Sequence, residues 1–482
     1  MVTKEQFSAS AASPVIAVTG SISDAQALEP IGWRGHDDPD NPKNWSAAWN
    51  WSAVAITSLG SFVSLSSSTL IAPALKSISH DLDMDTSTGQ IALSIFILPW
   101  GLGPLIWAPL GETFGRKPVW LGGCVLYILA NTLCGQTNSA GALTVTRLIA
   151  GFGASASLAT AMPVLSDCWR AEERGRSLAV STSAPLVGPA VGPRWAFYIL
   201  SMFSALLLLA ALFMFRETHS ETILRRRAAR LDRKSNEKST EWRTMLTKGT
   251  SLGILSNMER PLRLLYQDRV VQIVVLYFGY NFGNCYIVLS TFANLWITRY
   301  GQSTTDSGLH YIALAIGYLA AGHGGGILMD RIWRRLHARD GRNGSNCDSD
   351  RPVPEYRVPL MLLGGVLTPI GLLWYGWTAE TRQFWLLPDI GVAILGFGFI
   401  LTTQALQAYV MDAFPHCVGS ASAATQLFRG VAGFAFPIFG PKLYDRLGYG
   451  WGNSLMALLA ALIGIPCPIL LWKYRAWLMA KS

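Results

Sequence analysis

Long apolar runs, separated by short polar loops, fill the chain between residues 51 and 473. Most of these runs contain the roughly 20 residues that a helix needs to cross about 30 Å of hydrocarbon. The twelve runs fall at about 51–76, 90–111, 118–136, 141–164, 177–193, 196–215, 270–292, 308–328, 358–378, 384–411, 418–440 and 452–473. The pattern predicts an all-α polytopic membrane protein with twelve transmembrane helices.

A polar segment in the middle of the chain separates the twelve runs into two sets of six. Arg, Lys and Glu are frequent between residues 216 and 269. Two six-helix halves around a cavity at the membrane midplane are typical of secondary transporters. The predicted parts are a cytoplasmic tail at 1–49, a six-helix bundle at 50–215, a cytoplasmic central loop at 216–269, a second six-helix bundle at 270–473 and a cytoplasmic tail at 474–482.

The composition agrees with a membrane protein and argues against several other classes. Half of the 482 residues are hydrophobic and only 14% are charged, whereas about 25% of the residues in a soluble domain are charged. The net charge of +9 does not indicate nucleic-acid binding, because the basic residues lie mostly between apolar runs. The chain has no P-loop pattern, no HExxH pattern and no metal-type spacing of its seven Cys. We therefore expect neither an ATP-driven pump nor an enzyme, and neither a cofactor nor a metal.

The distribution of basic residues predicts the orientation in the membrane. With both termini in the cytoplasm, only about 6 of the 39 Lys and Arg fall in outer loops, in agreement with the positive-inside rule. The first 45 residues are polar, so we expect no cleavable signal peptide. We predict a monomeric, multi-pass protein of the plasma membrane, with the vacuolar membrane as the alternative.

A short charged motif recurs at corresponding places in the two halves. "GETFGRK" follows the second run, and "DRIWRRL" follows the eighth. We interpret both as parts of a gating latch at the cytoplasmic face, in which Glu112 with Arg116 corresponds to Asp330 with Arg331. A carboxylate at this place can also cap the N-terminus of a neighbouring helix. The predicted latch consists of Glu112, Gly115, Arg116, Lys117, Asp330 and Arg331.

Several motifs, taken in order, resemble the major facilitator superfamily and, within it, the fungal drug:proton antiporters with twelve helices. Each motif is weak alone, but together they cover nearly the whole chain after about residue 32. The resemblance implies two bundles that alternate access to a central site and that exchange substrate for protons. Besides "GETFGRK", the motifs are "DDPDNPKNW" at 37–45, "RLIAGFG" at 147–153, "GPAVGP" at 188–193, "RETHSETIL" at 216–224 and "YVMDAF" at 409–414.

The fifth run carries the motif that, by this resemblance, marks proton-coupled exporters, and this run is unusually short. The motif residues are Gly188, Pro189, Gly192 and Pro193, and the sixth run begins almost immediately after them. At 1.5 Å per residue, 177–193 spans roughly 25 Å, which is less than the hydrocarbon core. Either the gene model has lost a coding segment, or the deletion is real and transport is impaired.

Charged and titratable residues inside the membrane are candidates for function. Arg147 resembles the residue that is tied to proton coupling in the family, and Arg429 lies within the eleventh run, where a structural role is an alternative. His323 is the most buried-looking titratable group, and Asp412 lies near the end of the tenth run. The candidates for proton coupling are therefore Arg147, His323, Asp412 and Arg429.

The candidate substrate pocket is expected between the two halves, near the midplane. Tyr277, Asn281 and Asn284 share one face of the seventh helix at spacings of four and three, and Gln404 and Gln407 lie on the tenth. Aromatic rings with a few amides and no fixed acid suit a neutral or mixed amphipathic molecule.

These features predict a proton-coupled secondary transporter that exports drugs, toxins or secondary metabolites across a fungal membrane. Its partners would be a small-molecule substrate, protons and the lipid bilayer. The alternatives are an organic acid or polyamine transporter on the same fold, or a transport-impaired membrane protein with a truncated fifth helix. Fold alone decides neither the substrate nor the direction of transport.

Overall fold

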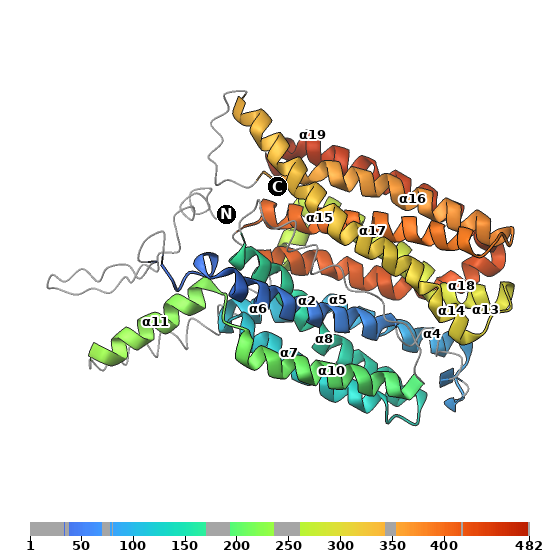
Figure 1. Ribbon diagram of the computed structural model, residues 1–482, viewed down its shortest axis with the longest axis horizontal. Helices are drawn as coiled ribbons and strands as arrows, with labels where there is room; N and C mark the ends of the chain where they lie inside the picture. The colour runs from blue at the N-terminus through green and yellow to red at the C-terminus, as the bar shows by residue number, and fades with distance from the viewer. Residues whose placement is uncertain are drawn as a thin grey trace.

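The computed structural model describes residues 33, 38–69, 78–79, 81–169, 193–235, 261–342, 353–415 and 418–480, and helices dominate these ranges (Figure 1). The first half contains α2 (Ala47–Thr69), α4 (Thr86–Ser94), α5 (Ile97–Leu102), α6 (Pro104–Phe114), α7 (Arg116–Cys134), α8 (Ala140–Cys168) and α10 (Pro193–Met214). The second half contains α13 (Arg269–Arg299), α14 (Thr304–Leu309), α15 (Tyr311–Arg342), α16 (Val358–Glu380), α17 (Leu386–Ala413), α18 (Val418–Gly464) and α19 (Pro466–Ala480). Along the chain, α11 (Ser220–Ser235) connects the two halves. The two short 3-10 helices are η2 (Pro42–Asn44) and η4 (Pro354–Arg357).

Nine stretches of the described residues form helices that are long and apolar enough to cross a membrane. One of them, Val418–Lys473, reverses direction at Gly448, where the backbone leaves helical geometry (φ 71°, ψ 174°), and it supplies two passes. The more polar α2 coincides with the first predicted run. In the described part of the chain, helices therefore occupy every predicted run except the fifth.

The fifth run lies almost entirely within 170–192, outside the described residues. The expected truncation of this helix, and the motif residues Gly188, Pro189 and Gly192, lie there too. Pro193, which we expected at the end of the fifth run, is instead the first residue of α10. Proline is favoured in the first turn of a helix, because that turn has no internal partner for its N–H group.

On α10, two serines face the protein, while several large apolar side chains face outward. Met202, Leu206 and Phe213 are all more than 60% exposed, whereas Ser201 and Ser204 are buried. The buried Asn131 of α7 donates hydrogen bonds to the Phe197 carbonyl and the Ser201 hydroxyl, at 2.8 and 2.9 Å. Such inverted polarity is stable where lipid surrounds the bundle, since small and polar residues then provide the helix contacts.

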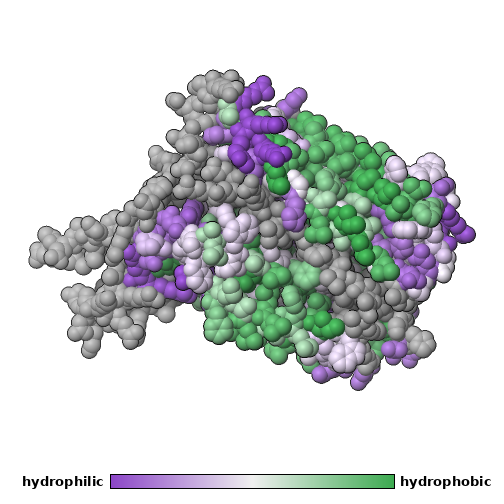
Figure 2. All heavy atoms as spheres, viewed as in Figure 1, coloured by the Kyte–Doolittle hydropathy of each residue, from purple (hydrophilic) through white to green (hydrophobic). Residues whose placement is uncertain are grey.

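The two halves lie side by side, with their helices running roughly parallel to the long axis of the molecule (Figure 1). The first leg of α18 joins them, because it packs on α4, α5, α6 and α8 of the first half. α11 projects from one end of the bundle, which we call the α11 end, and α14 lies at the opposite end, which we call the α14 end. Figure 2 shows apolar side chains along the middle of the visible face and hydrophilic ones towards both ends, as expected for a multi-pass membrane protein.

Candidate functional site

The halves meet at the α11 end through Glu112, a residue of the predicted latch. Its carboxylate lies at the first turn of α18, where the Ser420 hydroxyl donates to Oε1 at 3.5 Å. A Cβ atom on Gly419 would come within 2.6 Å of the same oxygen. The N-terminus of a helix has a partial positive charge, so Glu112 links the second span of the first half to the eleventh span of the second half.

Arg116 and Lys117 begin α7, and both backbone N–H groups are capped by a residue that sequence reasoning did not single out. Glu217, between α10 and α11, accepts from Arg116 N at 2.7 Å and from Lys117 N at 3.2 Å. The preceding Gly115 has φ 103° and ψ 161°, a region that is essentially restricted to glycine. A Cβ atom there would lie 2.3 Å from a Glu217 oxygen. The signal for Glu217 was its place in the segment "RETHSETIL", which resembles the family.

The side chain of Arg116 is buried and lies close to the carboxylate of Asp167, at the end of α8, with 3.8 Å between Nε and Oδ2. The matching pair in the second half is formed by Arg357, which precedes α16, and Asp412, near the end of α17. Their Nε and Oδ2 atoms are 2.8 Å apart, and both side chains are fully buried. Asp412, a candidate for proton coupling, is therefore part of a buried ion pair.

This arrangement corrects the predicted correspondence between Arg116 and Arg331. The sequence motif suggested that a helix ends at Asp330 and Arg331, but α15 continues to Arg342. Asp330 is buried and Arg331 is exposed on the same helix. The position at the start of the next span, which Arg116 holds in the first half, belongs to Arg357.

Arg147 lies about two turns after the start of α8 and is fully buried. Its NH1 group donates to the Ser67 carbonyl at 2.8 Å, its NH2 group donates to the Leu93 carbonyl at 3.4 Å, and its guanidinium lies 4.6 Å from the centre of the Phe96 ring. These contacts connect α8 with α2, α4 and the segment before α5. The charge is thus held by carbonyl dipoles and an aromatic face.

Arg429, on the first leg of α18, is enclosed by aromatic rings from both halves. Its guanidinium lies 4.1 Å from the Phe282 ring centre, 4.4 Å from that of Trp100 and 5.6 Å from that of Phe278. Gln426, one turn earlier, accepts a hydrogen bond from NH1 at 3.0 Å. Trp100 belongs to α5 in the first half, so this cluster crosses the interface between the halves.

The interface is tight at this level. A Cβ atom on Gly101 of α5 would approach the Cα of Gly430 on α18 to 2.3 Å. Nearby, the hydroxyls of Ser68 and Tyr286, from α2 and α13, are 2.7 Å apart. Glycine permits such close backbone contact between transmembrane helices. At this level the described helices of the two halves are therefore in direct contact, with aromatic rings and polar groups packed against one another.

His323 is not buried, contrary to the expectation from the sequence. It lies on the exposed side of α15 with Ile316, Leu319 and Ile327, which are also exposed. Its Nδ1 atom is 3.1 Å from the Leu319 carbonyl oxygen. The sequence was misleading because apolar residues occur on every side of this helix, so an apolar neighbourhood along the chain did not reveal which side faces the protein.

Tyr277, Asn281 and Asn284 do share one side of α13, and that side faces the interior of the second half. Tyr277 donates to the Met361 carbonyl of α16 at 3.1 Å, and Asn281 donates to the Phe399 carbonyl of α17 at 3.3 Å. All three line a cavity of about 10 Å³, which is about the space that one water molecule needs. As a substrate pocket this set stays a prediction.

Gln404 and Gln407 are both buried on α17. Gln404 donates from Nε2 to the Gly322 carbonyl of α15 at 3.2 Å. The Oε1 atom of Gln407 is buried without a hydrogen-bond partner among the described residues. Gln404 therefore connects two helices of the second half, whereas Gln407 has unused capacity for a ligand.

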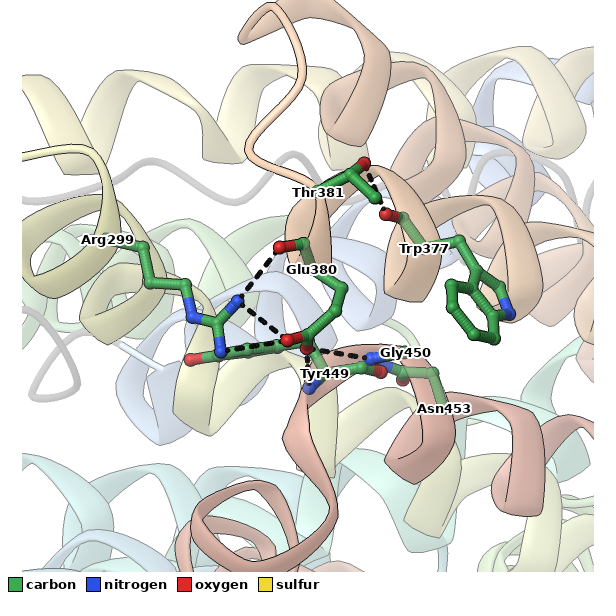
Figure 3. Close-up of polar contacts among 7 residues, drawn as sticks. All are labelled: Arg299, Trp377, Glu380, Thr381, Tyr449, Gly450 and Asn453. Carbon is green, nitrogen blue, oxygen red and sulfur yellow. Dashed lines mark hydrogen bonds and ion pairs between the residues drawn. The ribbon is translucent and has the colours of Figure 1, made fainter.

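The α14 end has its own cluster of polar contacts, which sequence reasoning did not identify (Figure 3). Glu380, the last residue of α16, accepts from the backbone N–H groups of Tyr449 and Gly450 at 2.6 and 3.2 Å. Arg299, the last residue of α13, reaches the same carboxylate at 3.3 Å. Gly448, with its non-helical φ of 71°, precedes the capped residues. The cluster connects the seventh, ninth and twelfth spans.

A second polar cluster at the α14 end is built around His310. Its Nδ1 atom is 2.7 Å from Asp389 Oδ2, and its Nε2 atom is 2.9 Å from Gln302 Oε1. Its ring stacks on Trp296, with 3.6 Å between the ring centres. These contacts connect the α14 ends of α13, α15 and α17. Among the described residues, no three His, Cys, Asp or Glu side chains gather in a way that could hold a metal ion.

Comparisons with known proteins agree with this architecture. The family model of the Major Facilitator Superfamily matches residues 57–437. The probable efflux pump mfs2 of Aspergillus flavus is 38% identical over 86% of this chain and 99% of its own length. The efflux pump vrtL of Penicillium aethiopicum is 35% identical over 94% of this chain and 90% of its own length.

Solved structures show the same fold at low sequence identity. The proton:xylose symporter XylE bound to 6-bromo-6-deoxy-D-glucose superimposes with a TM-score of 0.62 at 15% identity, over 89% of this chain and 96% of its own. The human organic anion transporter MFSD10 superimposes with a TM-score of 0.60 at 16% identity, over 87% and 99%. At these identities the comparison concerns the fold alone.

Proposed function

The chain belongs to the Major Facilitator Superfamily, and we propose that it is a proton-coupled secondary transporter that exports small amphipathic molecules across a fungal membrane. Drugs, toxins and secondary metabolites are the expected substrates. The observation that carries the proposal is the similarity, over nearly the full length of both chains, to fungal proteins named as efflux pumps.

The interface between the halves supports this substrate class. Trp100, Phe278 and Phe282 offer aromatic faces around one cation, and the hydroxyls of Ser68 and Tyr286 lie nearby. An apolar, aromatic surface with a few convergent polar groups suits a ligand that has both kinds of surface. Because these residues come from both halves, separation of the halves would expose the surface to one side of the membrane.

Alternating access requires contacts between the halves that break without damage to either half. Glu112 against the first turn of α18 is such a contact, since it is a single carboxylate at a helix N-terminus. We propose that the α11 end is cytoplasmic and that this contact favours the state closed to the cytoplasm. The plasma membrane is the proposed location.

Dye efflux from a yeast strain that lacks its own drug pumps tests the proposal. Cells that express the protein are loaded with the neutral dye Nile red or with the anionic dye fluorescein, and intracellular fluorescence is followed with and without a protonophore. We expect lower dye retention than in control cells, and the difference should disappear when the proton gradient collapses. Efflux that persists without the gradient would contradict proton coupling.

Glu112→Gln is the matched variant for the role of the contact between the halves. We expect it to reach the membrane in normal amounts and to export dye several-fold more slowly, because an uncharged side chain interacts less strongly with the helix dipole. Wild-type rates of dye export in this variant would contradict the proposed role of Glu112 in gating.

The alternative functions predict other outcomes. Uptake of citrate or spermidine in place of efflux would favour the organic acid or polyamine alternative, and no transport of any probe would favour an impaired carrier.

A further inference from the structure

Two buried arginines are connected to Tyr286 of α13, at the interface between the halves, through its neighbours. Arg429 of α18 lies 4.1 Å from the Phe282 ring centre, and the Phe282 ring stacks on Tyr286. On the other side, the Tyr286 hydroxyl contacts Ser68, and Arg147 of α8 donates to the carbonyl of the adjacent Ser67. Among the described residues, neither guanidinium is in an ion pair. The centre of the interface is therefore positively charged, and a charge inside the membrane requires compensation.

The two arginines differ in how well they are satisfied. Arg147 donates to two backbone carbonyls, although its Nε is buried without a hydrogen-bond partner among the described residues. Arg429 donates to one described residue, Gln426. Arg429 Nε, Gln426 Nε2 and Trp100 Nε1 are all buried without a hydrogen-bond partner among the described residues. Three unused N–H donors thus accompany one aromatic cluster, and buried donors of this kind ordinarily have an acceptor.

The cluster is divided between the halves in a way that suits a ligand site. Trp100 comes from the first half, and Arg429, Phe278 and Phe282 come from the second. When the halves separate, the Trp100 ring leaves the guanidinium and one side of the cation becomes open. A carboxylate matches a guanidinium in geometry and charge and can accept two parallel hydrogen bonds from it. The two phenylalanine rings that remain can hold an apolar body.

We propose that Arg429 binds the anionic group, specifically a carboxylate, of an amphipathic substrate, and that the Trp100 ring occupies this place in the empty, closed carrier. This inference adds a substrate class to the proposed export function. It rests on that function, because the bound molecule is a substrate only if the protein transports it. The cation–π contact explains how the carrier closes without a ligand, because an aromatic face partly compensates a buried charge.

A binding experiment on the full-length protein in phosphatidylcholine nanodiscs tests this inference. The two probes are 2-naphthoate and 2-naphthamide, which have the same ring system and differ in the charged group. Equilibrium dialysis of each labelled probe gives the dissociation constants. For the wild-type protein we expect the carboxylate to bind at least about tenfold more tightly than the amide, since a hydrogen bond to a charged group contributes about 1.5–3 kcal/mol.

Variants at the two central residues give opposite expectations. Arg429→Gln should abolish the preference for naphthoate, and Arg429→Lys should retain part of it. Trp100→Leu should increase the affinity for naphthoate several-fold, because the ring no longer competes with the carboxylate. A gain of affinity cannot arise from misfolding. Arg446→Gln, an exposed position on the same helix, removes one positive charge elsewhere and should change neither affinity.

Equal affinities for the two probes in the wild-type protein would overturn the inference, as would an unchanged preference in Arg429→Gln. If Arg429→Gln does not fold, an unchanged naphthoate affinity in both Arg429→Lys and Trp100→Leu overturns it. The assay needs neither a proton gradient nor export. Selective binding without efflux would therefore refute the proposed function alone, and proton-driven efflux without carboxylate preference would refute this inference alone.

Discussion

The two halves use the same local device at opposite ends of the molecule. At the α11 end, Gly115 precedes α7, and Glu217 caps the first N–H groups of that helix. At the α14 end, Gly448 precedes the twelfth span, and Glu380 caps its first N–H groups. In both, the glycine has a backbone conformation that other residues rarely adopt, and a Cβ atom there would collide with the capping carboxylate.

The difference between the two lies in their surroundings. Glu217 is buried and lies next to the buried Arg116, whereas the Glu380 side chain is about one-third exposed and is paired with Arg299 (Figure 3). Neither cap crosses the interface between the halves, but Glu112 does. Each cap therefore lies within one half, and a rigid-body movement of the halves relative to each other would leave both caps intact.

The largest expected effect concerns the two arginine–aspartate pairs that occupy matching places in the halves. Asp412→Asn should lower the free energy of unfolding by about 3–5 kcal/mol, because it removes the negative charge that lies 2.8 Å from the fully buried Arg357. Asp167→Asn should cost about 1 kcal/mol, since its partner is 3.8 Å away and Asp167 is partly exposed. Denaturant unfolding of both variants in mixed micelles measures the difference. Equal losses would show that the pairs are equivalent despite their geometry.

The next effect concerns the two glycines. Gly115→Ala and Gly448→Ala should each destabilise by at least about 2 kcal/mol, from backbone strain of about 1–3 kcal/mol and displacement of the cap. Gly115→Ala should destabilise the protein more than Gly448→Ala, because its Cβ would lie 2.3 Å from the carboxylate oxygen, compared with 2.7 Å at position 448. Thermal unfolding in nanodiscs compares them. Gly122→Ala in α7, where a Cβ meets nothing within 4 Å, is the control and should be neutral or stabilising.

A smaller effect concerns the charge of the two caps. Glu217→Gln should lower the free energy of unfolding by about 1–2 kcal/mol, because a neutral hydrogen bond replaces a buried charge-assisted one. Glu380→Gln should cost less than about 1 kcal/mol at low salt, because its ion pair is partly exposed. In 1 M salt, where the Debye length is about 3 Å, the effect of Glu380→Gln should nearly vanish. A salt-independent loss there would indicate a tighter site than the contacts suggest.

The smallest effect is a pH dependence at the α11 end. Burial, together with Arg116 and Arg225, lowers the pKa of His219 to about 3, from an ordinary value of about 6.5. The unfolded chain therefore binds a proton below about pH 6.5 while the folded protein does not, so this stability is full above pH 6.5 and is lost as the pH falls towards 3. We expect the melting temperature to fall between pH 7 and pH 5 by more in the wild-type protein than in His219→Gln. Parallel curves would mean that His219 does not contribute.

Sequence reasoning found the residues of the interface better than it found their partners. It identified Glu112, Arg116, Arg147 and Arg429, because charges inside or beside an apolar run are conspicuous. It did not identify Glu217, Glu380 or Arg357, because each acts on a helix that is distant along the chain. Their roles depend on which helix ends meet, and a single sequence does not contain that information.

The sequence by itself determined the number and limits of most spans, the division into two halves and the presence of two arginines within the membrane. These follow from length and composition, since a span needs about 20 apolar residues and a charge among them is rare. Only the tertiary structure decided which side of each helix faces the protein. It placed His323 on the exposed side, turned Tyr277 and its neighbours into the second half, and surrounded Arg429 with rings from both halves. In a membrane both sides of a helix can be apolar, so the periodicity that reveals the buried side in a soluble protein is weak.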